Sequence, residues 1–117
     1  MINARKEPTT AWMLARIVTG DANYSEALAT VQRSHRFPLH LFVQIENLAR
    51  LGKVPVSLII NQLIECGLEA VKHELPEETA GQLTIYTKDQ AERPTKTERV
   101  EIKGRNLPPR KKPKAGK

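Results

Sequence analysis

The 117 residues include one cysteine, Cys66, so the chain cannot form an intramolecular disulfide. This excludes the small secreted domains that depend on several disulfides, and it is typical of a reducing compartment. Long apolar runs are also missing. The longest, residues 12–18 and 54–60, fall far below the roughly 20 residues that cross a bilayer. Since the N-terminus has no signal-peptide layout, we expect a soluble cytoplasmic protein without a membrane partner.

Motifs for catalysis or metal binding are absent as well. No Gly-rich phosphate loop, paired-carboxylate signature or nucleophile motif occurs. His35 and His40 fall on opposite faces of a predicted strand, and His73 is distant in sequence. Cys66 has no neighbour at metal-ligand spacing. We expect no enzyme activity, no catalytic residues, no metal site and no cofactor.

Basic residues are in excess, with a formal net charge of +6 and a pI of about 9.7. This balance favours an anionic partner, nucleic acid above all. The excess is not in the centre, because residues 34–75 carry four basic and four acidic side chains, whereas residues 76–117 carry eleven and six. DNA binding by the centre must therefore depend on the arrangement of its residues.

The N-terminal part predicts two helices. Thr9 or Thr10 is placed to cap the first, and Gly20 stands where a left-handed C-terminal cap is common. Asn23 and Glu26 have the spacing of a capping box at the start of the second. Its apolar stripe would consist of Ala27, Leu28 and Val31.

This extension has two interpretations. It is a helical hairpin that packs on the central domain, or it is a contact surface for another dimer or another protein. In the second case Trp12, the only tryptophan, is the anchor.

An alternating stretch in the centre predicts a strand at residues 36–43. Its two faces would carry Phe37, Leu39, Leu41 and Val43 on one side and Arg36, Pro38, His40 and Phe42 on the other. A lone strand cannot satisfy its own backbone, and no second strand lies nearby in the chain. The partner strand must therefore come from elsewhere.

Two helices are predicted after this strand. The first, from about residue 43, ends at Gly52, with Lys53 in the turn. Pro55 suits the start of the second, which runs from Val56 to about Leu75.

The second helix carries more apolar surface than its neighbour can cover. Its stripe is too wide for a partner no larger than the first helix, so further surface is needed. Gly67 inside this helix indicates a close helix crossing, and Pro76 stops the helix.

This order of parts resembles the ribbon-helix-helix family of DNA-binding proteins, the Arc and MetJ class. The resemblance lies in RFPLHLF for the ribbon, QIENLARLGK for the first helix and turn, and VPVSLIINQLIECGLEAV for the second helix, about a third of the chain. It implies a mainly α fold in which two subunits form an intertwined homodimer. Their strands would pair into a two-stranded antiparallel ribbon that lies in the DNA major groove.

The resemblance also implies which residues contact DNA. Arg36 is the best candidate for a base edge or a nearby phosphate, because guanidinium offers two donors to guanine. A contact by His40 would depend on pH. The amides at the start of the second helix would hold a backbone phosphate. The implied DNA contacts are Arg36, Pro38, His40, Lys53, Val56 and Ser57.

The C-terminal part is interpreted as a flexible basic tail. LTIYT at 83–87 and RVEIK at 99–103 alternate like short strands and predict either a hairpin or a structureless linker. Residues 105–117 hold six basic residues and too little apolar surface to fold. This arm would raise DNA affinity in a salt-dependent, sequence-independent way. Its phosphate contacts would come from Arg110, Lys111, Lys112 and Lys114.

Together these patterns predict a homodimer that binds specific double-stranded DNA, most simply as a transcriptional repressor of a bacterial, plasmid or phage operon, with higher-order assembly on DNA as an option. The predicted parts are an N-terminal helical extension (1–33), a DNA-binding and dimerisation domain (34–76) and the tail (77–117). Two other functions stay open: an accessory DNA-binding protein of plasmid transfer or partition, and an antitoxin that binds a toxin through its flexible segment. A helix-turn-helix is the alternative fold, although a helix-opening proline fits its turn poorly.

Overall fold

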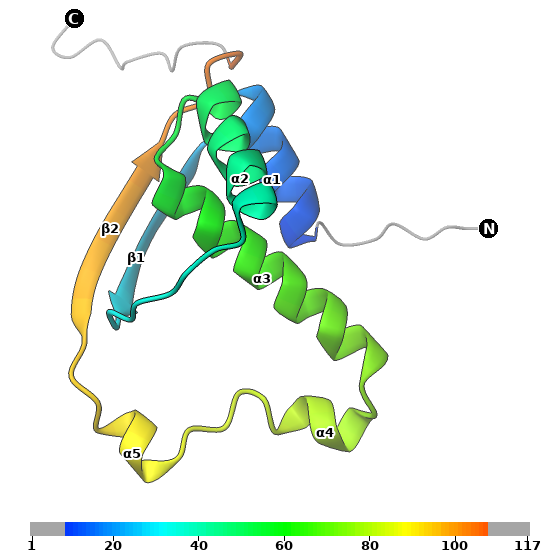
Figure 1. Ribbon diagram of the computed structural model, residues 1–117, viewed down its shortest axis with the longest axis vertical. Helices are drawn as coiled ribbons and strands as arrows, with labels where there is room; N and C mark the ends of the chain where they lie inside the picture. Colours follow the sequence, from blue (N-terminus) through cyan, green and yellow to red (C-terminus); the bar gives the residue numbers. More distant parts are fainter. Residues whose placement is uncertain (1–8, 108–117) are drawn as a thin grey trace, which may run out of the picture.

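The structure is a computed structural model that describes residues 9–107. It contains the helices α1 (Thr10–Thr19), α2 (Leu39–Gly52), α3 (Val56–Glu74), α4 (Glu77–Gly81) and α5 (Lys88–Ala91), and the strands β1 (Tyr24–Thr30) and β2 (Lys96–Ile102). The fold is mixed, mainly helical with one two-stranded antiparallel sheet. Figure 1 shows α1, α2 and the first part of α3 gathered beside one end of the sheet, whereas α4 and α5 lie away from them.

The first predicted helix is confirmed as α1. The Thr9 side chain accepts a hydrogen bond from the Trp12 amide at 3.1 Å, and Gly20 ends the helix in the left-handed region at φ 85°. Glu69 of α3 accepts a hydrogen bond from the Thr10 amide at 3.3 Å, which adds a carboxylate at the positive end of α1. This contact joins the start of α1 to the second half of α3.

The second predicted N-terminal helix is wrong, because residues 24–30 form β1. Asn23 does not cap a helix; its side-chain oxygen accepts a hydrogen bond from the Gly104 amide at 2.8 Å. Glu26 accepts a hydrogen bond from the Tyr24 hydroxyl. The segment becomes a strand because it pairs with β2, from Tyr24 opposite Ile102 to Thr30 opposite Lys96. That partner lies at the other end of the chain, where a local pattern cannot reveal it.

The interpretation of residues 77–117 as one flexible tail is also corrected. Most of RVEIK lies in β2, but its partner is β1, and residues 83–87 form no strand. The short helix α5 begins with a capping box between Thr87 and Gln90. Residues 77–107 therefore contain two helices and half of the sheet, and residues 108–117 lie outside the described part of the chain.

The predicted strand at residues 36–43 is wrong as well. Residues 31–38 form neither helix nor strand, and α2 begins at Leu39 with Pro38 as its N-cap at φ −58°. Proline is pre-set for a helix start, and it keeps the residue before it extended, so the boundary falls there. Ile45 and Leu48 then pack against the core at helical spacing.

The turn between α2 and α3 follows the prediction in position but not in detail. Gly52 is the last residue of α2, yet the left-handed residue is Lys53, at φ 55°. Gly52 serves another purpose, because a Cβ on it would lie 3.1 Å from the Val18 Cα of α1. Glycine therefore favours the close packing of α1 on α2, because a Cβ would force the two helices slightly apart.

The limits of α3 are confirmed. The helix starts at Val56 after Pro55, and it ends at Glu74 before the C-cap Leu75 and Pro76. The close crossing predicted at Gly67 is wrong within this chain, because a Cβ there would meet nothing within 4 Å.

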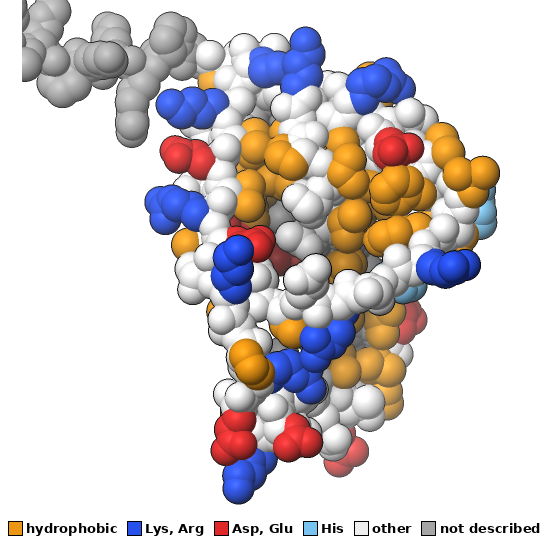
Figure 2. Space-filling view, turned by 60° about the vertical axis from the view of Figure 1, so that its left-hand side comes forward, with side chains coloured by type: hydrophobic (Ala, Val, Ile, Leu, Met, Phe, Trp, Pro, Cys, Tyr) orange, Lys and Arg blue, Asp and Glu red, His pale blue; other side chains and the backbone are white. Residues whose placement is uncertain are grey.

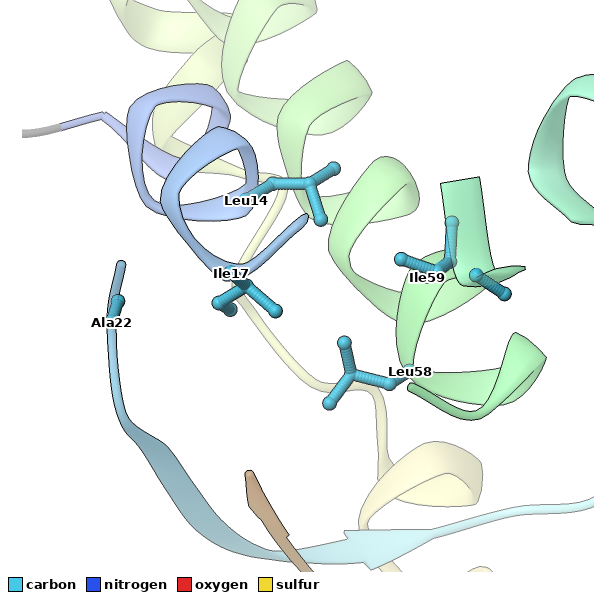
Figure 3. Close-up of a cluster of buried hydrophobic side chains, with 6 residues drawn as sticks. Leu14, Ile17, Ala22, Leu58 and Ile59 are labelled. Carbon is cyan, nitrogen blue, oxygen red and sulfur yellow. The ribbon is translucent and has the colours of Figure 1, made fainter. Parts of the chain in front are cut away.

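A small apolar core lies where α1, α2, α3 and the turn before β1 meet (Figure 3). Its buried members are Leu14, Ile17, Ala22, Ala49, Leu58 and Ile59. Gln62 of α3 is also buried, and its side-chain amide donates to the Tyr24 hydroxyl at 3.1 Å. The predicted N-terminal extension and central domain thus share one core.

Replacing either of the helical glycines, Gly52 or Gly67, with alanine should change the free energy of unfolding, and the two changes should have opposite signs. Gly52→Ala pushes a methyl group against the α1 backbone and should lower the free energy of unfolding by roughly 1–3 kcal/mol. The methyl group of Gly67→Ala meets open space. This variant should raise the free energy of unfolding by up to about 1 kcal/mol, because alanine has a higher helix propensity than glycine. Urea unfolding followed by circular dichroism measures both. A stabilising Gly52→Ala would contradict the tight contact with Val18.

Candidate nucleic-acid interface

The connecting segment, residues 31–37, leads from the sheet into α2 and is exposed along its whole length. The Phe37 ring packs edge-on against His35, with centroids 4.7 Å apart, and lies 5.1 Å from the Phe42 ring of α2. Phe37 is therefore held toward the first turn of α2. Arg36 is exposed immediately beside it.

None of the three predicted ribbon residues is on a strand: Arg36 lies in the connecting segment, and Pro38 and His40 belong to the start of α2. Pro38 is the N-cap of α2, and His40 lies in the first turn, where its carbonyl accepts a hydrogen bond from the Gln44 side chain at 3.1 Å. Pro38 and His40 therefore do not alternate with Arg36 on one strand face. The prediction misjudged this because it continued a two-residue period across a proline that starts a helix.

The start of α3 has the features predicted for phosphate binding. Its N-cap is Pro55, and no side chain caps the helix. The first helical hydrogen bonds come from Leu58 and Ile59 to the Pro55 carbonyl. Ser57 and Lys53 are exposed, and Val56 is half-buried against the core. An uncapped helix start beside a lysine offers amide donors and positive charge to an anion.

The predicted contacts fall into two groups. Lys53, Val56 and Ser57 come together at the α2–α3 turn. Arg36 precedes α2, a helix of 14 residues, so a length of about 21 Å separates it from Lys53. The four predicted tail contacts, at residues 110, 111, 112 and 114, lie outside the described residues.

Apolar side chains on α2 and α3 remain exposed. On α3, Ile64, Leu68 and Val71 expose 54%, 55% and 52% of their surface and follow one another at helical spacing. On α2, Leu39 is 77% exposed. We call these residues of α3 the α3 stripe. Figure 2 shows hydrophobic side chains gathered on one face of the molecule, with Lys and Arg side chains around them.

Residues 9–107 contain neither a metal-binding cluster nor a single membrane-spanning helix. No group of three or more His, Cys, Asp or Glu side chains is placed to hold a metal ion. No single helix is long and apolar enough to cross a bilayer; α2 and α3 reach that length and composition only as a pair bent by 115°.

A groove between β1 and α3 is acidic, in contrast to the basic α2–α3 turn at Lys53. It is lined by Glu26 and Glu65 together with Tyr24 and Gln62. Burial, followed by the charges of Glu26 and Glu69, raises the pKa of Glu65. Carboxylates repel phosphates, so this groove does not belong to a nucleic-acid interface.

Sequence patterns missed Arg105 and Asn106, which bind the ends of α1 and α2. Their partners are 53 to 87 residues away along the chain, so no motif or periodicity could have indicated them.

The burial of Glu65 and the repulsion from its neighbours predict a pH-dependent variant. Because the pKa of Glu65 is raised on folding, its ionised form disfavours the folded state; this cost decreases as pH falls through the raised pKa and is lost below the ordinary glutamate pKa of the unfolded chain. Glu65→Gln should therefore stabilise the protein at pH 7, and the gain over wild type should vanish by about pH 4. Urea unfolding of Glu65→Gln and of wild type at pH 7 and at about pH 4 measures the difference in stability. An equal gain at both pH values would contradict the role of charge.

The chain was compared with protein-family models, with curated proteins and with solved structures, and it matches none of them significantly.

Proposed function

We propose that the protein is a homodimeric double-stranded DNA-binding regulator, most simply a transcriptional repressor, built on a ribbon-helix-helix module in residues 31–75. The observation that carries the proposal is the exposed connecting segment followed by two helices whose outer faces are apolar. Within residues 9–107 no strand pairs with the segment, and nothing covers the outer side chains of the helices. A second copy supplies both the strand and the cover.

The small core supports dimerisation. Only six hydrophobic residues are buried in residues 9–107, whereas three large side chains of the α3 stripe are more than half exposed. A chain of this size has a marginal core by itself, and exposed apolar surface of this kind is typical of an interface. The stripe is the part of α3 turned away from α1 and the sheet, so a second copy has access to it.

The geometry of the connecting segment supports a ribbon that lies earlier in the chain than the predicted strand at residues 36–43. With Phe37 turned toward α2, the alternation of an extended chain puts Gln32, Ser34 and Arg36 on the other side. If two such segments pair across the dimer, these side chains point away from the helices and toward the major groove. Arg36 remains the candidate for base reading, and Gln32 and Ser34 replace Pro38 and His40.

The turn at Lys53 supports contacts to the DNA backbone. Its charge and the uncapped amides of α3 suit a phosphate. Such contacts position the protein without reading sequence. Lys53 adopts a left-handed conformation that glycine would adopt at less cost, so a lysine here accepts a conformational penalty and adds a positive charge.

The dimer is tested on the α3 stripe. Wild-type protein should sediment as a dimer at micromolar concentration, and Leu68→Asp should shift it to monomer because a carboxylate would be buried in the interface. Ala70→Asp is the matched control, since residue 70 is exposed and lies about 200° around the helix from residue 68. A folded wild-type monomer at this concentration would overturn the proposal.

DNA reading is tested by selecting preferred duplexes from a random library and then measuring binding by two variants. Arg36→Ala should cost about 1–3 kcal/mol of discrimination between the selected and random duplexes. Lys53→Ala should weaken binding to the selected and the random duplexes alike. It should also lower the slope of log affinity against log salt concentration by about one, the value of one phosphate contact. Equal effects of the two variants on discrimination would contradict the assignment of the ribbon.

A further inference from the structure

Hydrogen bonds on both sides hold the backbone of Arg105, which follows the end of β2. The Gly104 amide donates to the Asn23 side chain at 2.8 Å, and the Asn106 amide donates to the Gly20 carbonyl, also at 2.8 Å. Both acceptors belong to the turn between α1 and β1. The sheet and this turn therefore place Arg105 beside the C-terminal ends of α1 and α2 (Figure 1).

The side chain of Arg105 joins the ends of these two helices. Its guanidinium donates to the Gly52 carbonyl at the end of α2 and, at 3.2 Å, to the Val18 carbonyl of α1. A cation is favourable here, because the C-terminal ends of helices carry partial negative charge. Gly20 leaves room for it, since a Cβ there would lie 3.1 Å from the guanidinium. The side chain is thus used for contacts within the protein.

The Gly52 carbonyl belongs to the peptide group that leads into Lys53. The N–H of this group donates to the Arg50 carbonyl at 3.2 Å, and the amide that follows Lys53 donates to the Ala49 carbonyl at 3.0 Å. Because peptide groups are planar, these two bonds and the one from Arg105 fix the groups on both sides of the Lys53 Cα. They therefore set the direction in which the Lys53 side chain leaves the backbone.

Lys53 needs such support because its backbone conformation is unfavourable. Among residues 9–107 it is the one non-glycine residue with a positive φ, at 55°. A residue with a Cβ keeps this conformation only where the surrounding structure holds it. Arg105 supplies part of that hold from outside the turn, since it lies 53 residues away from Gly52 along the chain.

We propose that Arg105 is a positioning residue for the contact between Lys53 and the DNA backbone. By holding the Gly52 carbonyl, it keeps the α2–α3 turn in the conformation from which the exposed Lys53 side chain reaches a phosphate. This inference rests on the proposed DNA binding. Its physical basis is preorganisation, because a contact made from a fixed backbone loses less conformational entropy on binding. The sheet then acts in DNA binding through Arg105, without touching DNA there.

The test is a double-mutant cycle in the full-length protein, with a 30-base-pair duplex of arbitrary sequence as the probe. Arg105→Lys keeps the positive charge but loses the planar guanidinium that donates to two carbonyls. Lys53→Ala removes the proposed phosphate contact. Affinity is measured over a range of salt concentrations, and circular dichroism checks the fold. Arg99→Lys, the same change at an exposed position on β2, is the matched control.

Asn106→Ala is a second variant that weakens the hold on Arg105 without changing charge. The Asn106 side chain donates to the Thr19 carbonyl at 2.7 Å and to the Asp21 carboxylate at 3.0 Å. Its removal loosens the chain beside Arg105 and leaves the guanidinium in place. This variant keeps the test decisive if Arg105→Lys does not fold.

With Lys53 present, Arg105→Lys should lower affinity by about two- to tenfold. It should also lower the slope of log affinity against log salt concentration by up to about one, because one phosphate contact is weakened. In the Lys53→Ala background it should change neither the affinity nor the slope, because the contact that Arg105 positions is already absent. Asn106→Ala should follow the same pattern with a smaller factor, and Arg99→Lys should bind as wild type does.

Three results would contradict these expectations. If Arg105→Lys lowers affinity by the same factor in both backgrounds, Arg105 does not act through Lys53, and the positioning role is overturned while DNA binding stands. If Arg105→Lys binds as wild type does, the geometry of the guanidinium is not needed, and the positioning role is again overturned. If the wild-type protein shows no salt-dependent affinity for the duplex, both proposals are overturned.

Discussion

The pairing of β1 with β2 is the interaction on which the rest of the structure depends. It joins residues 24–30 to residues 96–102 and so brings an early and a late segment of the described chain together. The inner face of the sheet lies over α3, where Tyr24 meets the buried Gln62. The outer face stays exposed. Without this pairing, α3 would lose its cover on this side, and Arg105 and Asn106 would not be held beside the ends of α1 and α2.

The sheet covers only one side of α3, and this asymmetry shapes the proposed function. Leu58, Ile59 and Gln62 are buried against α1 and β1, whereas the α3 stripe stays exposed. A helix with two apolar sides is stable in water only when both are covered, which is why a second copy enters the proposal. Helix α1 and strand β1 thus add to the core of the single chain, and they leave the α3 stripe free as the proposed dimer surface. It also keeps the acidic groove, with Glu26 and Glu65, on the sheet side of α3.

Sequence patterns predicted the elements that are specified by nearby residues. The cap at Thr9, the left-handed Gly20 and the boundaries at Pro55 and Pro76 are all confirmed, because each depends on contacts within a few residues. The same principle applied to Pro38 would have placed the start of α2 correctly. The alternation of apolar residues 37–43 was misleading, because Leu39, Leu41 and Val43 are all exposed in the single chain. Their spacing therefore did not indicate a strand in this chain.

The sequence by itself determined the start of α1, the left-handed cap at Gly20, the limits of α3, the position of the α2–α3 turn and the excess of positive charge near the C-terminus, since these depend on local backbone preferences and composition. Only the tertiary structure decided that residues 24–30 form a strand, that Gly52 packs closely against Val18, and that Arg105 fastens the chain beside Lys53. The physical reason is sequence separation. Each of these contacts joins segments that are 34 or more residues apart, and such contacts leave no periodic pattern along the chain.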